Sequence, residues 1–183
     1  MTCQANNYYA LKGVVQLGSR VTVLPDYMFY YCGISSISFL STYNGSATSL
    51  PSRCFGYCKN LTSMSSLPTR FKSLGGYCFC YSGLSGVVDL RGTGLTGLTN
   101  DCIFYGCQAS TYKFPATLSA SSFGRHAFYQ NSKLTSIDLP STLTHIGYSA
   151  FGYCTSLMSV SIPSKVTYID NFAFVGCSRL TSV

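Results

Sequence analysis

Residues 133–154, KLTSIDLPSTLTHIGYSAFGYC, and residues 156–177, SLMSVSIPSKVTYIDNFAFVGC, are two copies of one pattern. Both keep Leu, Ile or Val, Pro, Phe and Cys at matching positions, while the residues between them differ. Self-similarity of this kind indicates that consecutive segments form equivalent structural units. The same phase can be followed through the rest of the chain.

The phenylalanine of AFGYC is the clearest marker of the period. Successive markers are 26, 24, 25, 24, 23 and 23 residues apart, which gives seven copies: Phe29, Phe55, Phe79, Phe104, Phe128, Phe151 and Phe174. Five residues before each marker the chain places a mostly apolar residue: Leu24, Leu50, Leu74, Thr99, Phe123, Ile146 and Ile169. Three residues after it stand Cys32, Cys58, Ser82, Cys107, Asn131, Cys154 and Cys177. These columns predict a core that repeats with the sequence.

Each copy predicts a short strand, a second extended stretch and a turn. In residues 134–140 and 157–163, alternate apolar residues precede a proline, which is typical of a strand that ends where no further N–H is available. The stretches LTHI and VTYI then lead into the phenylalanine segment, which we expect to be a turn or a single helical turn. About 23 residues cannot bury an apolar face alone, so neighbouring copies must stack with parallel strands. The predicted fold is a repeat solenoid, mostly strand and coil with short helical turns.

The pattern L-x-x-I-x-L-P, then I, then A-F-x-x-C, as in LTSIDLPSTLTHIGYSAFGYC, resembles the BspA-type leucine-rich repeat. The departures are the insertion STYNGSATS, the glycine-rich RGTGLTGLTN, and Ser82 and Asn131 in the cysteine column. The resemblance implies a right-handed leucine-rich-repeat stack used for adhesion and macromolecule binding at cell surfaces, without a common catalytic activity.

The repeats predict one domain over residues 1–183, with about seven repeats of 23–26 residues. Neither end shows the polar capping repeat that solenoids need, so we expect both ends to be uncapped. Either the chain is a segment of a longer protein, or another subunit covers the ends.

The composition of the chain limits the classes of partner that it can bind. The chain is 46% hydrophobic and 9% charged, and its net charge of +7 comes from lysines and arginines spread along its whole length. Because no recognition helix or stacking platform accompanies this charge, we expect no nucleic-acid partner. No stretch has the roughly 18 consecutive apolar residues of a membrane-spanning helix. The segment MTCQANNYYALKG does not have the pattern of a secretory signal.

Most of the ten cysteines have the pattern of core residues. Five occupy the column after the phenylalanine, and Cys54 and Cys78 precede it, where later copies have alanine. Free cysteine behaves as a small apolar residue, so we interpret these as core; the pattern requires no disulfide. A metal site is not expected at Cys54 and Cys58. Outside the two columns, Cys3, Cys80 and Cys102 are the candidates for exposed, reactive thiols.

The chain offers little for catalysis, since it has no Glu and only two histidines. His126 and His145 fall in different phases, and we interpret each as a surface residue. Asp26, Asp101 and Asp170 precede the phenylalanines and are expected to cap the helical turns. Because no catalytic or nucleotide-binding motif occurs, we predict that the protein is not an enzyme and holds no cofactor.

Two surfaces are candidates for binding. Outward positions of the strands form a polar face that includes Ser63, Ser65, Lys113, Ser136, Asp138, Ser159 and Ser161. Tyrosines follow the phenylalanines in six consecutive copies and predict a ridge: Tyr30, Tyr31, Tyr57, Tyr81, Tyr105, Tyr129 and Tyr153. The alternative interpretations are that serine only solvates the sheet and that tyrosine only shields the phenylalanines. Tyrosine is also well suited to protein or glycan contact.

These observations favour a non-catalytic module that binds a protein or glycan, outside the cell or at its surface. The alternative is a structural subunit that associates end to end into a filament or larger assembly. An intracellular scaffold is a third possibility.

Overall fold

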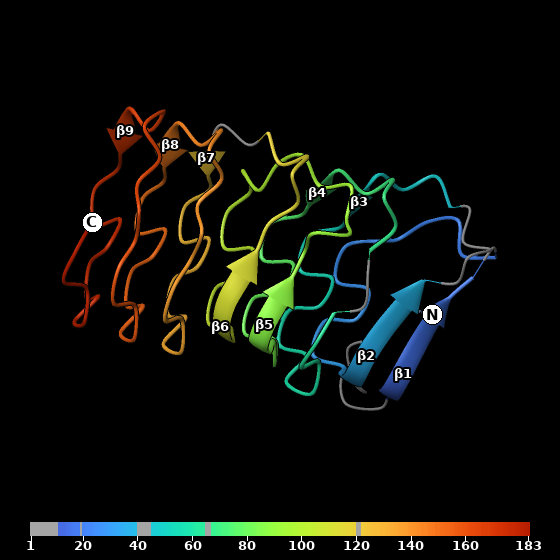
Figure 1. The fold of residues 1–183 in the computed structure, drawn as a ribbon. Coiled ribbons are helices and arrows are strands. Elements are labelled where there is room, and N and C mark those ends of the chain that lie inside the picture. Colours follow the sequence, from blue (N-terminus) through green and yellow to red (C-terminus); the bar gives the residue numbers. More distant parts are fainter. Residues whose placement is uncertain (1–10, 19, 40–44, 65–66, 120–121) are drawn as a thin grey trace.

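A computed structural model of the chain describes residues 11–18, 20–39, 45–64, 67–119 and 122–183. The described residues wind into an elongated solenoid whose turns lie side by side from β1 to β9 (Figure 1). The predicted repeat solenoid with short parallel strands is therefore confirmed.

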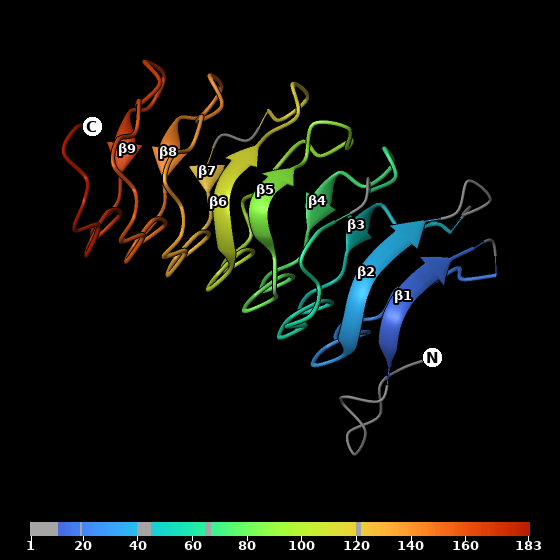
Figure 2. The ribbon, with the colours of Figure 1, turned by 60° about the horizontal axis from the view of Figure 1, so that its bottom comes forward.

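The strands fall into two groups. The longer ones are β1 (Lys12–Leu17), β2 (Gly33–Phe39), β5 (Ser85–Asp89) and β6 (Gln108–Lys113). The two-residue strands precede the phenylalanine segments: β3 (Ser49–Leu50), β4 (Ser73–Leu74), β7 (Ser122–Phe123), β8 (His145–Ile146) and β9 (Tyr168–Ile169). Every pairing is parallel: β1 with β2, β3 with β4, β5 with β6, β7 with β8, and β8 with β9 (Figure 2).

The strand prediction is wrong in the two clearest copies. Neither residues 134–140 nor residues 157–163 form a strand, although their inward residues Leu134, Ile137, Leu157 and Val160 are buried as expected. Here the Met158 N–H donates to the Thr135 carbonyl at 3.3 Å, but no strand ladder follows. Pro140 and Pro163 close both segments and cannot donate a main-chain hydrogen bond. The regular strands of these copies are β8 and β9.

The phenylalanine segments are double turns, not helical turns, and the described residues contain no helix. In the segment around Phe55, Gly56 N–H donates to the Arg53 carbonyl and Cys58 N–H to the Phe55 carbonyl. Arg53 and Tyr57 have φ of 53° and 59°. The positions two before and two after the phenylalanine are left-handed in all seven copies. A left-handed residue interrupts the right-handed helical path, which is why each turn stops after one hydrogen bond.

Main-chain bonds between copies offset the strain of this backbone. Phe55 N–H donates to the Cys78 carbonyl at 2.8 Å, and Arg53 and Tyr57 N–H donate to Gly76 and Cys80. The same three bonds recur at each of the six junctions. A left-handed non-glycine residue costs roughly 1–2 kcal/mol, and each copy has at least one. Stacking therefore holds the double turns in a conformation that an isolated copy would leave.

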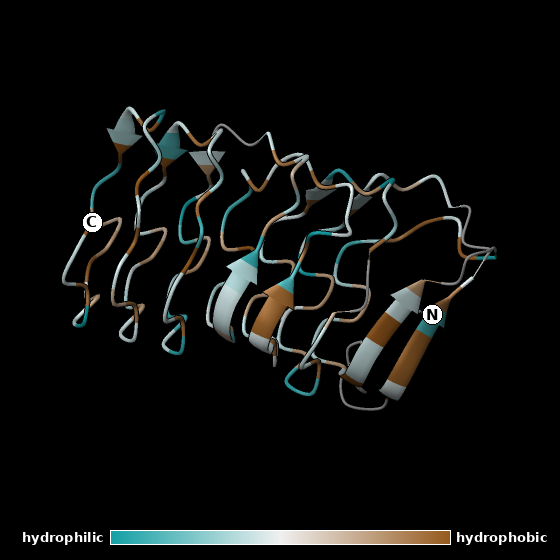
Figure 3. Cartoon of the chain, viewed as in Figure 1, coloured by the Kyte–Doolittle hydropathy of each residue, from teal (hydrophilic) through white to brown (hydrophobic). Residues whose placement is uncertain are grey.

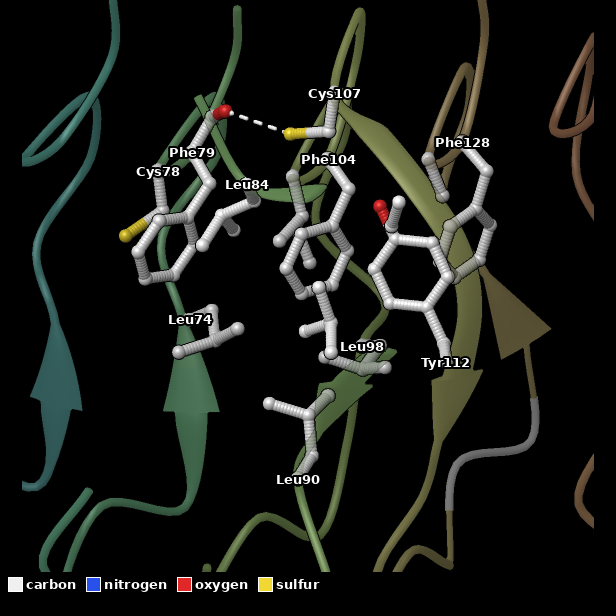
Figure 4. Close-up of a cluster of buried hydrophobic side chains, with 14 of the residues drawn as sticks. Leu74, Cys78, Phe79, Leu84, Leu90, Leu98, Phe104, Cys107, Tyr112 and Phe128 are labelled. Atoms are coloured by element: carbon white, nitrogen blue, oxygen red, sulfur yellow. Dashed lines mark hydrogen bonds between the residues drawn. The ribbon is translucent and has the colours of Figure 1, made fainter. Parts of the chain in front are cut away.

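The phenylalanines stack in one column through the core. Neighbouring rings have centroids 5.2–5.7 Å apart and are within 15° of parallel. Phe29, Phe55, Phe79, Phe104, Phe128 and Phe151 are buried, and Phe174 is partly buried. Leucines in the strands and beside them pack around the phenylalanines, among them Leu74 of β4 and Leu84 and Leu90 on either side of β5 (Figure 4). Along the ribbon, apolar and polar residues alternate (Figure 3), as expected for turns with one face in a shared core.

The side chains of the cysteine column donate hydrogen bonds as well as pack in the core. The Cys107 thiol donates to the Phe79 carbonyl of the preceding copy, with Sγ 3.1 Å from the oxygen (Figure 4). Cys58, Cys154 and Cys177 make the equivalent bond at 2.9–3.2 Å. Asn131 replaces the thiol with its amide, 2.7 Å from the Phe104 carbonyl. The column therefore favours a small side chain that can donate a hydrogen bond, which a purely apolar interpretation did not anticipate.

Asn131 also joins the core to a buried tyrosine. Its Oδ1 accepts from the Tyr112 hydroxyl at 2.6 Å, and its Nδ2 donates to the Phe104 and Phe128 carbonyls at 2.7 and 2.9 Å. Both side chains are fully buried. The polar atoms of the Asn131 amide are thus satisfied inside an apolar core, as buried polar groups must be.

Two further predictions need correction. In the fourth copy the buried residue is Leu98, not the exposed Thr99, because this copy has an extra residue before its double turn. The aspartates do not cap helical turns: Asp26 accepts from Ser52 N–H and Asp101 from Arg125 N–H, each in the following copy. Asp170 accepts from its neighbour Asn171. The first two carboxylates therefore join copies together.

Candidate functional site

The seven tyrosines predicted as a ridge lie together on the edge formed by the double turns. We call this set, Tyr30, Tyr31, Tyr57, Tyr81, Tyr105, Tyr129 and Tyr153, the tyrosine ladder. Consecutive rings contact each other without a break, with centroids 4.4–5.4 Å apart from Tyr31 to Tyr153. Tyr30 joins through Tyr31 and Tyr57. All are partly buried except Tyr153, which is 46% exposed.

Glycines in the next copy make room for several of these rings. A Cβ at Gly106 would lie 2.4 Å from the Tyr81 ring, and one at Gly152 would lie 2.7 Å from the Tyr129 ring. Tyr30 lies over Gly56 and Tyr153 over Gly176 in the same way. A tyrosine followed one period later by a glycine was a signal available in the sequence, and it explains why some repeats read GYC.

Cations lie on the ladder and its flanks. The Arg53 guanidinium lies 5.3 Å from the Tyr27 ring centroid and 4.5 Å from that of Tyr77, and its Nη1 donates to the Tyr27 hydroxyl at 2.9 Å. The Lys59 ammonium lies 5.0 Å from the Tyr81 ring centroid. Cations are attracted to the faces of tyrosine rings, so these side chains are held in place without a carboxylate.

Between the ladder and the residues two before each phenylalanine is a hollow of about 580 Å³, which we call the first hollow. Its lining is Tyr30, Arg53, Tyr57, Tyr77, Cys80, Tyr81, Cys102, Tyr105, His126 and Tyr129. A second hollow of about 620 Å³ also contacts Tyr81, and Lys59, Gln108, Gln130 and Ser132 are among its other lining residues. Both volumes are in the usual range for ligand sites.

Four phenols of the first hollow, those of Tyr57, Tyr77, Tyr105 and Tyr129, have raised pKa values and stay protonated over a wide pH range. Burial raises the pKa of Tyr57, Tyr105 and Tyr129. The pKa of Tyr77 is raised chiefly by its hydrogen bond with Cys102. Burial, then the nearby Arg125 charge, lowers the pKa of His126. At neutral pH the hollow therefore contains phenol hydroxyls and an uncharged imidazole as hydrogen-bonding groups, with Arg53 as its cation.

The cysteine and histidine predictions need revision here. Cys80 and Cys102 line the hollow but are only 5% and 4% exposed, so they are not exposed thiols. Burial raises the pKa of Cys80 to about 12. In the adjacent copies, Tyr105 occupies the position equivalent to Cys80, and Tyr77 and His126 occupy the position equivalent to Cys102. His126 is partly buried against Tyr129 and Tyr148. Cys3 lies outside the described residues.

His145 is also partly buried, against Tyr168, rather than a simple surface residue. Its Nε2 is buried with no hydrogen-bond partner. It lies on β8, away from the double turn that carries His126, so the structure does not bring the two histidines together. In the described part of the chain, no three residues of the metal-ligating types cluster as a metal site would require.

The polar strand face is separate from the ladder. Ser63, Lys113, Ser136, Asp138, Ser159 and Ser161 are exposed, and Ser65 lies outside the described residues. Lys113 and Asp138 line a smaller hollow of about 370 Å³ together with Arg91. Arg91 and Asp89 form an exposed ion pair at 2.6 Å. This face follows the cysteines in each copy, whereas the ladder lies on the double turns. The described residues contain no helix that is long and apolar enough to span a membrane.

Comparison with known proteins identifies the repeat. The family described as the BspA type leucine rich repeat region matches residues 7–91 and 97–183 in six copies. None of the curated proteins is significantly similar to the chain. A leucine rich cell surface protein from Faecalibacterium prausnitzii A2-165 has a similar solved structure, with a TM-score of 0.58 and 17% identity; the match covers 94% of this chain and 59% of that one.

Two other solved structures are less similar. A leucine-rich repeat protein from Bacteroides ovatus ATCC 8483 gives a TM-score of 0.49 at 22% identity, covering 86% of this chain and 51% of that one. The Treponema pallidum protein, described as T. pallidum Leucine Rich Repeat protein, gives 0.49 at 21% identity, with 91% and 77% covered. This chain thus spans about half to three quarters of the length of these three proteins. The family match covers nearly every residue, and the chain therefore belongs to the BspA-type leucine-rich repeat family.

Proposed function

We propose that this protein is a non-catalytic module that binds a macromolecule, acts in adhesion or recognition at the cell surface, and makes contact through the tyrosine ladder. Leucine-rich repeats of this family are typically binding modules and generally non-catalytic. The likeness to a bacterial cell surface protein supports the proposed location. The ladder extends over six copies, so its contact area grows with the number of repeats rather than being confined to one cleft.

The observation that carries the proposal is the unbroken ladder with a hollow on each side of Tyr81. Tyrosine gives a large, stiff contact area with a polar end, at a small entropic cost. A row that only shielded the phenylalanines would not need hollows of ligand size beside it. The ladder and its glycines also fix the spacing of the hydroxyls before any ligand arrives, which lowers the cost of binding.

A paired binding screen tests the proposal. Immobilised glycans and extracellular host proteins would be probed with the wild type and with a Tyr57→Ser, Tyr105→Ser variant, two ladder positions that do not lie over a glycine in the next copy. We expect the variant to lose about tenfold or more in affinity for any ligand found. A Ser136→Asn, Ser159→Asn variant on the polar strand face is the matched control. Unchanged binding by the tyrosine variant, together with loss in the serine variant, would transfer the site to the strand face.

End-to-end assembly is the second candidate function. In the last described copy, Tyr168, Ile169 and Phe172 are 57%, 45% and 60% exposed, whereas Ile146 in the preceding copy is buried. A further repeat, from the same polypeptide or from a second copy of the chain, would cover them. Light scattering at increasing protein concentration separates the candidates: growth into polymers supports assembly, and a constant monomer mass supports the binding module.

A further inference from the structure

Charge and hydrogen-bonding groups are arranged unevenly around the tyrosine ladder. The first hollow is lined by Arg53 and the second by Lys59, and neither lining includes an acidic residue. Among the described residues the ion pair is that of Asp89 with Arg91, on the strand face, so Arg53 and Lys59 have no carboxylate partner there. Two cations next to ligand-sized hollows attract negative groups and repel positive ones.

We propose that the two hollows on either side of Tyr81 form one binding site for an acidic glycan, with Arg53 and Lys59 receiving its carboxylate or sulfate groups. This assignment rests on the proposed function and names the class of ligand that the ladder takes. Tyr81 lines both hollows, and its hydroxyl donates to Gln130 at 2.9 Å, so the two spaces adjoin.

Arg53 is prepared for this role before any ligand binds. Its guanidinium is held between Tyr27 and Tyr77 and uses an Nη1 hydrogen to bond the Tyr27 hydroxyl. A guanidinium has five N–H donors in a planar fork that matches two oxygens of a carboxylate or sulfate. The rings on its faces leave the edge of the fork as the part that can bond an anion. The Arg53 guanidinium also occupies the ring faces on which a positively charged ligand would bind.

The uncharged groups favour a hydroxyl-rich ligand. Tyr phenols line the first hollow, while Gln108, Gln130 and Ser132 line the second. These groups donate and accept hydrogen bonds in the way that sugar hydroxyls require. Many such bonds over several sugar units add up, although each contributes only about 1 kcal/mol.

An extended peptide fits this surface less well. At the double turns, the N–H groups of positions such as Phe55, Phe79 and Phe104 are already bonded to the following copy. A peptide strand would therefore not find these N–H groups free for strand addition, the mode that gives peptides affinity at a sheet edge.

Single-stranded nucleic acid fits less well too. Stacking of bases needs free aromatic faces. In the ladder, rings such as Tyr31 with Tyr57 and Tyr105 with Tyr129 are stacked on each other, with centroids 4.4 and 4.9 Å apart. Their edges and hydroxyls remain for a ligand, so we assign the site to a glycan.

The test measures binding of fluorescent oligosaccharides to the full chain by polarisation, at low and at physiological salt. The probes are oligogalacturonate, heparin oligosaccharide and uncharged dextran of similar length. Poly-glutamate and a single-stranded oligonucleotide represent the other anionic classes. We expect binding to at least one acidic glycan, weakened by salt, and at least tenfold weaker binding to dextran, poly-glutamate and the oligonucleotide.

The variants locate the site. Arg53→Gln is expected to weaken binding of the acidic glycan about tenfold, and Arg53→Lys less, because the charge remains while the fork is lost. Arg179→Gln, which changes the net charge equally at an exposed residue elsewhere, should change it less than twofold. Lys59→Gln is the second site variant, since Lys59 is exposed and its removal leaves the packing intact if Arg53→Gln fails to fold.

Each other outcome overturns the assignment. Equal effects of Arg53→Gln, Lys59→Gln and Arg179→Gln on glycan binding would show that the glycan responds to the net charge of the protein and not to a particular site. Tighter binding of poly-glutamate or the oligonucleotide would replace the glycan by another class. Binding of dextran alone, or of a host protein that depends on the ladder tyrosines but not on Arg53 or Lys59, would leave the proposed function standing while this inference falls.

Discussion

The buried pair of Asn131 and Tyr112 gives the sharpest test of how the stacked copies hold together. Asn131→Ala removes four side-chain hydrogen bonds: three short ones, to the Tyr112 hydroxyl and to the Phe104 and Phe128 carbonyls, and a long one of 3.5 Å to the Tyr129 carbonyl. At about 1 kcal/mol for each of the three short bonds, the free energy of unfolding should fall by about 3 kcal/mol. Asn131→Cys restores the thiol donor of the other copies and should lose less.

A double-mutant cycle makes this prediction specific. Tyr112→Phe alone should cost about 1 kcal/mol, because Asn131 loses one partner. In an Asn131→Ala background the same change should cost clearly less, since the hydroxyl keeps only its interaction with the Cys107 thiol. The resulting coupling of about 1 kcal/mol is within the range measured for side chains in direct contact.

Urea unfolding followed by circular dichroism, in the presence of a reductant, gives the four free energies. Ser132→Ala is the control, because it removes an exposed bond to Gln108 and should cost less than about 0.5 kcal/mol. If Asn131→Ala loses no more than Ser132→Ala, or if Asn131→Ala and Tyr112→Phe are additive, the buried network does not stabilise the stack as we argue.

Three other predictions follow from the double turns and the buried thiols. Gly106→Ala should destabilise the protein by about 2 kcal/mol, because the φ of Gly106 is 71° and an added Cβ would meet the Tyr81 ring. Gly97→Ala is the control and should be nearly neutral, because the space around Gly97 is open. Equal unfolding midpoints of the two variants would contradict this prediction. Iodoacetamide should label native Cys177 before Cys58 and Cys107. The hydrogen bond from the neighbouring Cys154 thiol lowers the pKa of Cys177, whereas burial raises the pKa of Cys58 and of Cys107 to about 12. Peptide mass mapping of the alkylated protein gives the order of labelling. The free energy of unfolding that protonated Cys58 and Cys107 contribute is complete below pH 9.0 and falls as the pH rises towards about 12. The expected loss is about 1.4 kcal/mol per pH unit for each thiol. A free energy of unfolding that stays constant between pH 9 and 11 would refute this prediction.

The repeat pattern carried most of the fold because it records an average over equivalent positions. Phe55 and Phe79 are one period apart, and they stack because each copy places its phenylalanine at the same point of the same path. The pattern was less informative where copies differ. Thr99 has the right spacing, but an extra residue moves Leu98 into the core.

The candidate surfaces were visible in the sequence, but their partners were not. Spacing alone aligned the tyrosines of the ladder. It did not indicate that Arg53 lies between Tyr27 and Tyr77, because these three residues come from three different copies. Cys80 and Cys102 were expected to be exposed, and they are covered by residues of adjacent copies.

The sequence by itself determined that equivalent segments stack, which residues form the interior column, and which side chains recur at the edge, because period and polarity are local properties of the chain. Only the tertiary structure decided what each side chain meets in the next copy: the carbonyl that Cys107 bonds, the tyrosine that Asn131 holds, and the glycine under Tyr81. These contacts join residues 19 to 28 positions apart in the chain. Their energies depend on distances of a few tenths of an ångström, which no pattern of residue types contains.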